Sequence, residues 1–218
     1  EHVAFGRRFG ELEIHPFTPN RDDYPEVIVI HHDEKSKIGE NQWHSDVTWR
    51  QEPSLGSILR ARVIPPVGGD TLFADMISAY ESLPEGLREE IEGATAVHSF
   101  EQNFGRRMTE EQRTKFREKF PPARHPVVRT HPETGKKALY VSRPFTTHIE
   151  GMEPEQSASL LRRLYHRSEI PEHQVRFRWK ENSVAFWDNR AVQHYAAFDY
   201  LPHERLVERV TIVGEKPY

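Results

Sequence analysis

The most constraining feature of this sequence is the stretch from Gln42 to Trp49, which carries a histidine and an aspartate among residues typical of a buried segment. Aromatic and β-branched residues dominate the stretch, and polar and apolar positions roughly alternate, a pattern that predicts a β-strand. Residues two apart on a strand point to the same face, so His44 and Asp46 would lie side by side. A buried imidazole and a buried carboxylate are costly unless a partner satisfies them.

Two kinds of partner could satisfy this pair. The two side chains could bond to each other or cap a strand, because structural ion pairs imitate functional sites. They could also hold one divalent metal ion. With a second histidine from a distant strand they would form a triad of two histidines and one carboxylate, which leaves coordination positions open and suits non-haem Fe(II) chemistry with oxygen.

The spacing alone is a weak signal, because four other histidines have an acidic residue two positions further on. These pairs are His31 with Asp33, His32 with Glu34, His131 with Glu133, and His148 with Glu150. The first two lead into a polar segment typical of a loop, and the third begins a turn through Pro132 and Gly135. Of the five pairs, only His44 and Asp46 lie in a stretch that is predicted to be buried.

Composition limits the class of protein. With 218 residues, of which 36% are hydrophobic and 29% charged, the chain can bury one large core, and we expect a single catalytic domain over residues 1–218. The net charge of −4 and the lack of a basic face argue against a nucleic-acid partner. No apolar run is long enough to cross a membrane. The absence of cysteine excludes disulfides and thiolate chemistry and favours a reducing, cytoplasmic location.

Many short strand-like runs with a few inserted helical segments fill the chain. Helices are predicted over residues 2–9, 77–83, 84–92, 109–119 and 153–167, and strand-like or extended runs over 11–14, 27–30, 57–64, 70–74, 95–100, 127–129, 138–141, 174–179, 183–187, 192–198 and 206–213. The charged helix at 109–119 is expected to be a solvated surface helix or a flap. Because the first residues look like the middle of a helix, we expect the native N-terminal segment to be missing. The pattern predicts a mainly β fold with inserted helices, a double-stranded β-helix or jelly roll.

The last part of the chain supplies a second histidine and two arginines. His194 follows a tight polar turn and lies on a predicted strand. Arg205 and Arg209 follow on the last strand and its approach, and four residues apart on an extended chain they would share a face. They could be surface arginines paired with Glu204 and Glu208. They could instead bind anions beside a metal, because the planar guanidinium group suits carboxylate or sulfonate.

Several motifs occur along the chain in an order that is more specific than any one of them. They are Phe9-Gly10-Glu11-Leu12, Ile14-His15-Pro16, Trp43-His44-Ser45-Asp46-Val47-Thr48, Gly68-Gly69-Asp70-Thr71, Trp187-Asp188-Asn189-Arg190 and Gln193-His194-Tyr195. In these motifs the sequence resembles the taurine dioxygenase family of Fe(II)- and 2-oxoglutarate-dependent oxygenases. The resemblance covers nearly the whole chain.

The resemblance implies a dioxygenase that uses Fe(II), 2-oxoglutarate and O2 to hydroxylate a small substrate, with succinate and carbon dioxide as co-products. The metal ligands that it implies are His44, Asp46 and His194. The residues that it implies for 2-oxoglutarate are Thr71 and Arg205 at the distal carboxylate and Arg209 near the metal-bound end. No side chain has to act as a nucleophile in this chemistry, which agrees with the absence of cysteine.

The resemblance also implies a substrate pocket and a substrate class. The pocket residues are His15, Val47, Phe104 and Phe145, with Arg209 reaching the anionic head of the substrate. Plain core packing is an open alternative for the two phenylalanines. Thr18, Glu40 and Asn103 stand where taurine-specific relatives typically carry tyrosine, asparagine and serine. We therefore expect a taurine-like sulfonate or an alkyl sulfate and a role in sulfur metabolism, and a non-sulfur carboxylate such as an aryloxyacetate is the alternative.

Two further function classes stay open. The same fold serves non-catalytic metal- or sugar-binding modules, but such a module would have no use for Thr71 and Arg205 beside an open metal. A Zn(II) hydrolase at the same ligands would need a positioned general base, and the sequence shows none. A homo-oligomer is expected by analogy with relatives.

Overall fold

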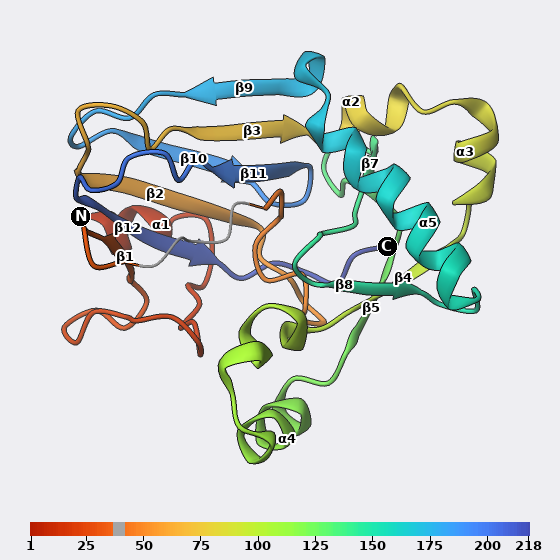
Figure 1. The fold of residues 1–218 in the computed structure, drawn as a ribbon, viewed down its shortest axis with the longest axis horizontal. Coiled ribbons are helices and arrows are strands. Elements are labelled where there is room, and N and C mark those ends of the chain that lie inside the picture. The colour runs from red at the N-terminus through yellow and green to blue at the C-terminus, as the bar shows by residue number, and fades with distance from the viewer. Residues whose placement is uncertain (37–41) are drawn as a thin grey trace.

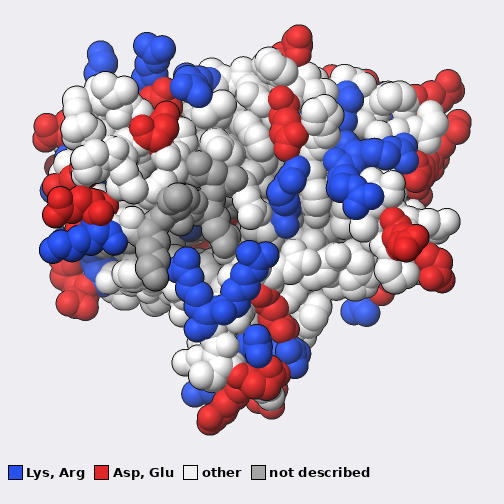
Figure 2. Space-filling model, viewed as in Figure 1, with Lys and Arg blue, Asp and Glu red and all other residues white. Residues whose placement is uncertain are grey.

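The computed structural model of this chain describes residues 1–36 and 42–218. The fold is mainly β with a few inserted helices, which confirms the predicted fold class at this level (Figure 1). None of the described helices is long and apolar enough to cross a membrane. On the face drawn in Figure 2, basic and acidic side chains are interspersed.

Two antiparallel sheets stacked on each other form one end of the molecule (Figure 1). The four-stranded sheet has the order β1-β12-β2-β10, with bounds Ile28–His32, Arg205–Ile212, Gly56–Val63 and Val184–Asp188. The three-stranded sheet has the order β11-β3-β9, with bounds Val192–Ala196, Thr71–Asp75 and Gln174–Phe177. Side chains of both sheets share one core cluster, in which Leu59 and Val207 meet Phe73 and Val192. A short turn after β10 carries the chain from the first sheet to the second.

A smaller sheet, a hairpin and three helices form the other end (Figure 1). The sheet has the order β5-β4-β8 (Ala123–Pro126, Thr95–His98, Thr146–Ile149), and the hairpin pairs β6 (Val128–Thr130) with β7 (Lys137–Leu139). The helices are α2 (Met76–Glu81), α3 (Glu85–Glu90) and α5 (Pro154–Tyr165). The helix predicted over residues 153–167 is present as α5, and one of its faces is apolar: Leu160, Leu161 and Leu164 are buried in the largest core cluster.

The remaining helices lie at the surface. They are α1 (His2–Gly6), α4 (Glu110–Lys119) and the 3₁₀ helices η1 (Phe100–Gln102), η2 (Phe104–Arg107), η3 (His166–Glu169) and η4 (Pro171–His173). A capping box begins α4: the Thr109 hydroxyl accepts from the Gln112 amide, and the Gln112 side chain accepts from the Thr109 amide. α4 has no fully buried residue and projects from the molecule, as expected of a solvated surface helix (Figure 1).

The strand predicted over residues 42–49 is wrong. His44 makes an isolated bridge to His194, and residues 46–49 form a turn in which Val47 has a positive φ of 58°. A β-branched residue rarely adopts this conformation, so the β-propensity of the stretch is overridden by tertiary packing. The buried surroundings that motivated the prediction are present, because residues 45–49 are all buried.

Three other expectations need correction. The strands β5 and β8 were not predicted, because Ala123–Pro126 and Thr146–Ile149 lack a clear alternating pattern and are ordered by pairing with β4. The first helix ends at Gly6 instead of residue 9, and residues 7–9 form a turn before Gly10. The predicted strand at 95–100 ends at His98, and η1 begins two residues later, at Phe100.

Replacing Ile58 by alanine is expected to lower the free energy of unfolding by about 2–5 kcal/mol. The Ile58 side chain is fully buried on the central strand β2, in a cluster with Val210 and Ile212, so its loss leaves a cavity. Urea denaturation measures the effect. The control is Val67→Ala, because Val67 is 74% exposed and its truncation should change stability by less than about 0.5 kcal/mol. Equal losses in the two variants would contradict this account of the core.

Candidate metal centre

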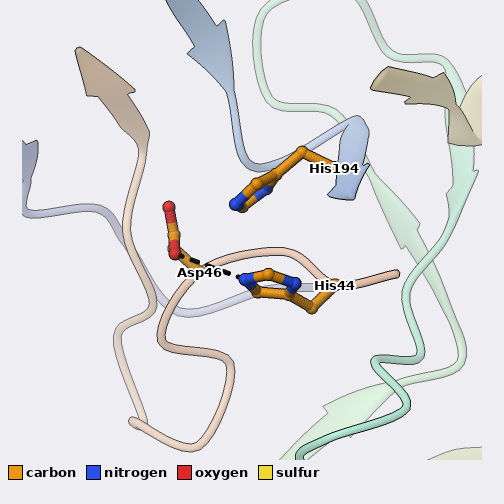
Figure 3. A group of neighbouring side chains, drawn as sticks. All are labelled: His44, Asp46 and His194. Carbon is orange, nitrogen blue, oxygen red and sulfur yellow. Dashed lines mark ion pairs between the residues drawn. The ribbon is translucent and has the colours of Figure 1, made fainter. Parts of the chain in front are cut away.

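Two segments that are far apart in the sequence meet at His44 and His194. The His44 amide donates to the His194 carbonyl (3.1 Å), and the His194 amide donates to the His44 carbonyl (2.8 Å). The turn that follows His44 then carries the Asp46 carboxylate toward the two imidazoles (Figure 3). His194 lies on β11, as predicted. The convergence of the three side chains therefore depends on a bridge and a turn, not on a continuous strand.

The three predicted ligands form one compact group (Figure 3). One potential ligand atom from each of His44, Asp46 and His194 lies within 4.8 Å of the others. The two imidazole centroids are 4.1 Å apart, and His44 Nε2 is 3.9 Å from Asp46 Oδ1. A distance of 3.9 Å is within the range of an ion pair but too long for a hydrogen bond, so the two side chains are near neighbours without a direct hydrogen bond. This is the only group of three such residues in the described part of the chain that could hold a metal.

Asp46 is nearly inaccessible and is held by other groups. Its Oδ1 accepts a hydrogen bond from Arg209 (2.5 Å), and its Oδ2 accepts one from the Ser57 hydroxyl (2.6 Å). Burial alone would raise the pKa of Asp46, but the charge of Arg209 and the neighbouring imidazoles lower that pKa well below its ordinary value. Asp46 is therefore an ionised carboxylate at neutral pH, the form that binds metal.

The two histidines are also in forms that suit a metal. Burial, followed by the neighbouring His44, lowers the pKa of His194 to about 3, so its ring is neutral at pH 7. Within residues 1–36 and 42–218 the buried Nδ1 of His194 has no hydrogen-bond partner. His44 Nδ1 donates to the Gln42 carbonyl (2.8 Å), which fixes the ring and directs Nε2 toward Asp46. The donor set of two imidazoles and one carboxylate fits Fe(II).

The other histidine and carboxylate pairs serve other contacts. His31 pairs with Glu204 (2.9 Å), and His131 pairs with Asp188 (3.1 Å). His32 accepts or donates a hydrogen bond at Tyr200 (2.9 Å), and His148 is exposed on β8. None of them joins a third ligand residue in the described part of the chain, which confirms that their spacing is incidental.

A cavity of about 190 Å³ adjoins the triad, and its walls include the three residues predicted for 2-oxoglutarate. Thr71, Arg205, Arg209 and His194 all line it. The Thr71 hydroxyl accepts a hydrogen bond from the Trp179 indole (2.9 Å), so its proton remains available to a ligand. The interior of this cavity is therefore cationic at one end and borders the candidate metal centre at the other.

The two arginines are not surface residues, so that alternative is wrong. Arg205 is 3% exposed and Arg209 is 8% exposed. Glu204 pairs with His31, and Glu208 pairs with Arg21 (3.0 Å).

Arg205 is a buried cation with no carboxylate at ion-pair distance in the described residues; the charge of Asp70 and a hydrogen bond with Tyr200 compensate it in part. Its Nε donates to the Gly69 carbonyl (3.2 Å), and its guanidinium lies 5.8 Å from the centre of the Tyr200 ring. No ion pair joins it to a carboxylate anywhere in residues 1–36 and 42–218, and burial lowers its pKa. A buried charge of this kind requires compensation, and an anionic ligand would supply it.

The predicted substrate-pocket residues lie together near the triad, and none of them lines the cavity that contains Arg205. The Phe145 ring is 6.4 Å from the His44 ring, and the Phe104 ring is 6.1 Å from Phe145 and 5.5 Å from His15. Val47 directly follows Asp46 and is buried with Phe145 in the same aromatic cluster. The two phenylalanines therefore pack in a core cluster and also border the candidate site.

His15 has a defined tautomer. Its Nδ1 accepts hydrogen bonds from the Phe17 amide (3.2 Å) and the Thr18 hydroxyl (2.7 Å), because an amide can only donate. Burial, together with Arg209, lowers the pKa of His15 to about 3, so the ring is neutral and carries its proton on Nε2. The Thr18 hydroxyl is thus already engaged in a hydrogen bond to His15, one of the predicted pocket residues. Asn103 lies between η1 and η2, and Glu40 is outside the described residues.

The sequence patterns did not single out Ser57 or Asn189. Both are fully buried and bond to Asp46, Ser57 through its hydroxyl and Asn189 through its side-chain oxygen. Asn189 belongs to the motif Trp187-Asp188-Asn189-Arg190, and this motif is the sequence signal that could have identified its role. Ser57 lies in an ordinary strand sequence with no distinguishing pattern.

Comparison with known proteins agrees with this geometry. Residues 1–211 match the family described as "Taurine catabolism dioxygenase TauD, TfdA family". An alkylsulfatase of Acinetobacter baylyi is 37% identical, covering 99% of this chain and 69% of that protein. An alpha-ketoglutarate-dependent sulfate ester dioxygenase of Pseudomonas putida is 37% identical, covering 98% of this chain and 72% of that protein.

Two further similarities bear on substrate class and fold. An alpha-ketoglutarate-dependent 2,4-dichlorophenoxyacetate dioxygenase of a Burkholderia species is 33% identical, covering 99% of this chain and 78% of that protein. The crystal structure of a taurine dioxygenase from Burkholderia xenovorans superposes with a TM-score of 0.81 at 40% identity, covering 99% of this chain and 72% of that chain.

Replacing Asp46 by alanine is expected to weaken Fe(II) or Mn(II) binding by more than about 100-fold, because it removes the only anionic ligand of the triad. Anaerobic isothermal titration calorimetry measures the dissociation constant. The matched control is Glu150→Ala, which removes the exposed carboxylate of an incidental pair and should leave the dissociation constant unchanged. Wild-type metal affinity in the Asp46 variant would refute the metal assignment.

Proposed function

This chain belongs to the taurine catabolism dioxygenase TauD, TfdA family, and we propose that it is an Fe(II)- and 2-oxoglutarate-dependent dioxygenase that oxidises a small sulfate ester or sulfonate. The observation that carries this proposal is the triad of His44, Asp46 and His194 beside a cavity lined by the buried Arg205, which has no ion pair with a carboxylate in the described residues. A metal centre and a buried cation at one cavity match a cosubstrate that is a metal chelator at one end and a carboxylate at the other.

Each residue has a defined part in this proposal. His44, Asp46 and His194 would hold the iron and leave positions for the keto acid and oxygen. When bound, the iron supplies the redox chemistry that couples oxidative decarboxylation of 2-oxoglutarate to hydroxylation of the substrate. Arg205 and Thr71 bind the distal carboxylate of 2-oxoglutarate.

Arg209 has two roles because of its position. It neutralises the Asp46 carboxylate (2.5 Å) and lines the cavity near His194, so it orients the ligand and can reach the anionic head of the substrate.

The arrangement around His15 supports an anionic substrate head. A neutral imidazole whose Nδ1 is fixed by Thr18 presents an Nε2–H donor and no positive charge. Such a group can donate to a sulfate or sulfonate oxygen over a wide pH range. The aromatic neighbours Phe104 and Phe145 suit an alkyl or other apolar tail.

Hydroxylation explains how sulfur would be released. If the hydroxyl is placed on the carbon that bears the sulfate ester or sulfonate, the product collapses to an aldehyde, and sulfate or sulfite leaves with the bonding electron pair. One O2 and one 2-oxoglutarate are consumed, and succinate and carbon dioxide account for the remaining atoms. The chain residues contribute binding, orientation and neutralisation of charge, and none acts as a nucleophile.

Several finer assignments belong to the same proposal. We assign the two facing sheets to a jelly roll, because they are antiparallel and are joined by the β10 to β11 connection next to the metal centre. An aryloxyacetate substrate is the second candidate, favoured by the 2,4-dichlorophenoxyacetate dioxygenase relative. A homo-oligomer and a cytoplasmic location stay predictions from the sequence.

Replacing Arg205 by glutamine is expected to weaken 2-oxoglutarate binding by roughly 10- to 100-fold, because a hydrogen bond to a charged group is worth about 1.5–3 kcal/mol. The readout is an anaerobic titration of the Fe(II)-loaded protein, followed by the charge-transfer absorption band of the chelate. Arg62→Gln is the control, since Arg62 is an exposed arginine on the same sheet. An absent band in the wild-type protein would favour a non-catalytic metal-binding module, and equal affinities in the two variants would remove Arg205 from the cosubstrate site.

A substrate panel tests the sulfur assignment. Linear alkyl sulfates and alkanesulfonates are expected to give succinate and released sulfate or sulfite in equal amounts, because hydroxylation and sulfur release are coupled. Taurine is expected to be a poorer substrate, since Thr18 is bonded to His15 instead of being a tyrosine that faces an amine. Succinate and sulfur anions are quantified in parallel for these compounds and for an aryloxyacetate. Uncoupled succinate at equal rates with every compound would overturn the assignment.

A further inference from the structure

The Asp46 carboxylate is held at both oxygens, and only one of these contacts involves a residue that lines the cavity. Arg209, which lines the cavity, donates to Oδ1. Ser57, on the central strand β2, donates to Oδ2 at 2.6 Å, a short distance typical of a hydroxyl bonded to a charged carboxylate. Oδ1 is the oxygen that lies 3.9 Å from His44 Nε2. Ser57 therefore occupies the oxygen opposite the one that is nearest to His44.

Asn189 connects this contact to the backbone of the turn. Its Nδ2 donates to the Ser57 hydroxyl (3.0 Å), and its Oδ1 accepts from the Asp46 amide (3.2 Å) and from the Trp187 indole (3.0 Å). Two N–H donors face Oδ1, so the amide group can have only this orientation. The Ser57 oxygen then accepts a hydrogen bond from Asn189, and the Ser57 hydroxyl donates its hydrogen to Asp46.

The network is fully enclosed. Ser57 and Asn189 are both 0% exposed, and Asp46 is 4% exposed. Neither Ser57 nor Asn189 lines the cavity beside the triad. In such surroundings water cannot replace a lost hydrogen bond, so each bond in the chain determines the orientation of the next group. Two strands, β2 and the end of β10, thereby fix the carboxylate of a turn that has no regular secondary structure of its own.

We propose that Ser57 and Asn189 are positioning residues that hold Asp46 as a one-oxygen metal ligand, with Oδ2 tied to the sheet and Oδ1, which also accepts from Arg209, kept on the side of His44. The proposal rests on the proposed function, because it requires a metal at the triad. Outer contacts of this kind orient metal ligands and usually change metal affinity by 10- to 100-fold when they are removed.

The test compares Ser57→Ala with Ser57→Thr, which keeps a hydroxyl group, and with Ser157→Ala. Ser157 is a matched control because it is also buried and hydrogen-bonded, to the Ile149 amide (2.8 Å), but lies on α5, outside the metal site. Three quantities are measured for each variant: the Mn(II) dissociation constant, the urea midpoint of the metal-free protein, and the absorption maximum of the anaerobic Fe(II) and 2-oxoglutarate complex.

The expected result separates positioning from stability. Ser57→Ala should weaken Mn(II) binding by roughly 10- to 100-fold and shift the absorption maximum. Ser57→Thr should recover most of the metal affinity. Ser157→Ala should lower the urea midpoint and leave metal affinity within about twofold of wild type.

The outcomes that overturn the proposal are distinct from a failure of the proposed function. If wild-type protein binds Mn(II) and Ser57→Ala binds it equally well, the positioning role is wrong and the enzyme assignment stands. If Ser157→Ala weakens metal binding as much as Ser57→Ala does, the effect is general destabilisation and the positioning role is again wrong. If wild-type protein binds no metal, the proposed function and the positioning role both fall. Should Ser57→Ala fail to fold, Asn189→Asp replaces it, because it keeps the acceptor and removes the donor to Ser57.

Discussion

A carboxylate buried at the centre of the molecule has to be compensated, and the way in which Asp46 is compensated organises the structure around it. Arg209 supplies the opposite charge from β12, and Ser57 supplies a hydroxyl proton from β2. Asn189, at the end of β10, bonds to the backbone of the turn. Neighbouring strands of one sheet therefore converge on a single acidic group, and the second sheet adds His194. In this arrangement the cost of burying a charge is offset by contacts that also define the position of a metal ligand.

The site separates two kinds of anion recognition. The cavity that contains Arg205 has a volume of about 190 Å³ and is lined by two arginines, which suits a small dicarboxylate such as 2-oxoglutarate. The region around His15, Phe104 and Phe145 is aromatic and has a neutral hydrogen-bond donor, which suits an anionic head with an apolar tail. A neutral donor binds a sulfate or sulfonate without adding a second buried cation next to Arg209. The triad borders both regions, because His194 lines the cavity and the His44 ring lies 6.4 Å from Phe145, so the proposed cosubstrate and substrate sites would share one centre.

Sequence reasoning predicted that His44, Asp46 and His194 come together, and the structure does bring them together, but the expected reason for their proximity was wrong. The side chains of His44 and Asp46 were expected to converge because of strand alternation, whereas a bridge to His194 and a strained turn at Val47 bring them together. Apolar surroundings were the reliable signal, because burial could be read from the neighbouring residue types. The pairing of β4 with β5 and β8 could not be read in this way, because short segments with proline or charge become strands only through their neighbours. Ser57 was missed for a related reason, since its role depends on which residue faces it across the fold.

The alternation of side chains along β12 has a consequence for how such chains can vary. Arg205, Val207 and Arg209 all line the cavity, because residues two apart lie on the same side of a strand. One inserted or deleted residue between the two arginines would turn one guanidinium toward the opposite face of the sheet. The preceding loop, residues 197–204, is tied to the same cavity, because Ala197, Phe198 and Tyr200 line it and the Tyr200 ring lies against Arg205. A change of chain length by one residue is therefore incompatible with this cavity between Arg205 and Arg209, where the strand fixes both guanidinium groups on one side.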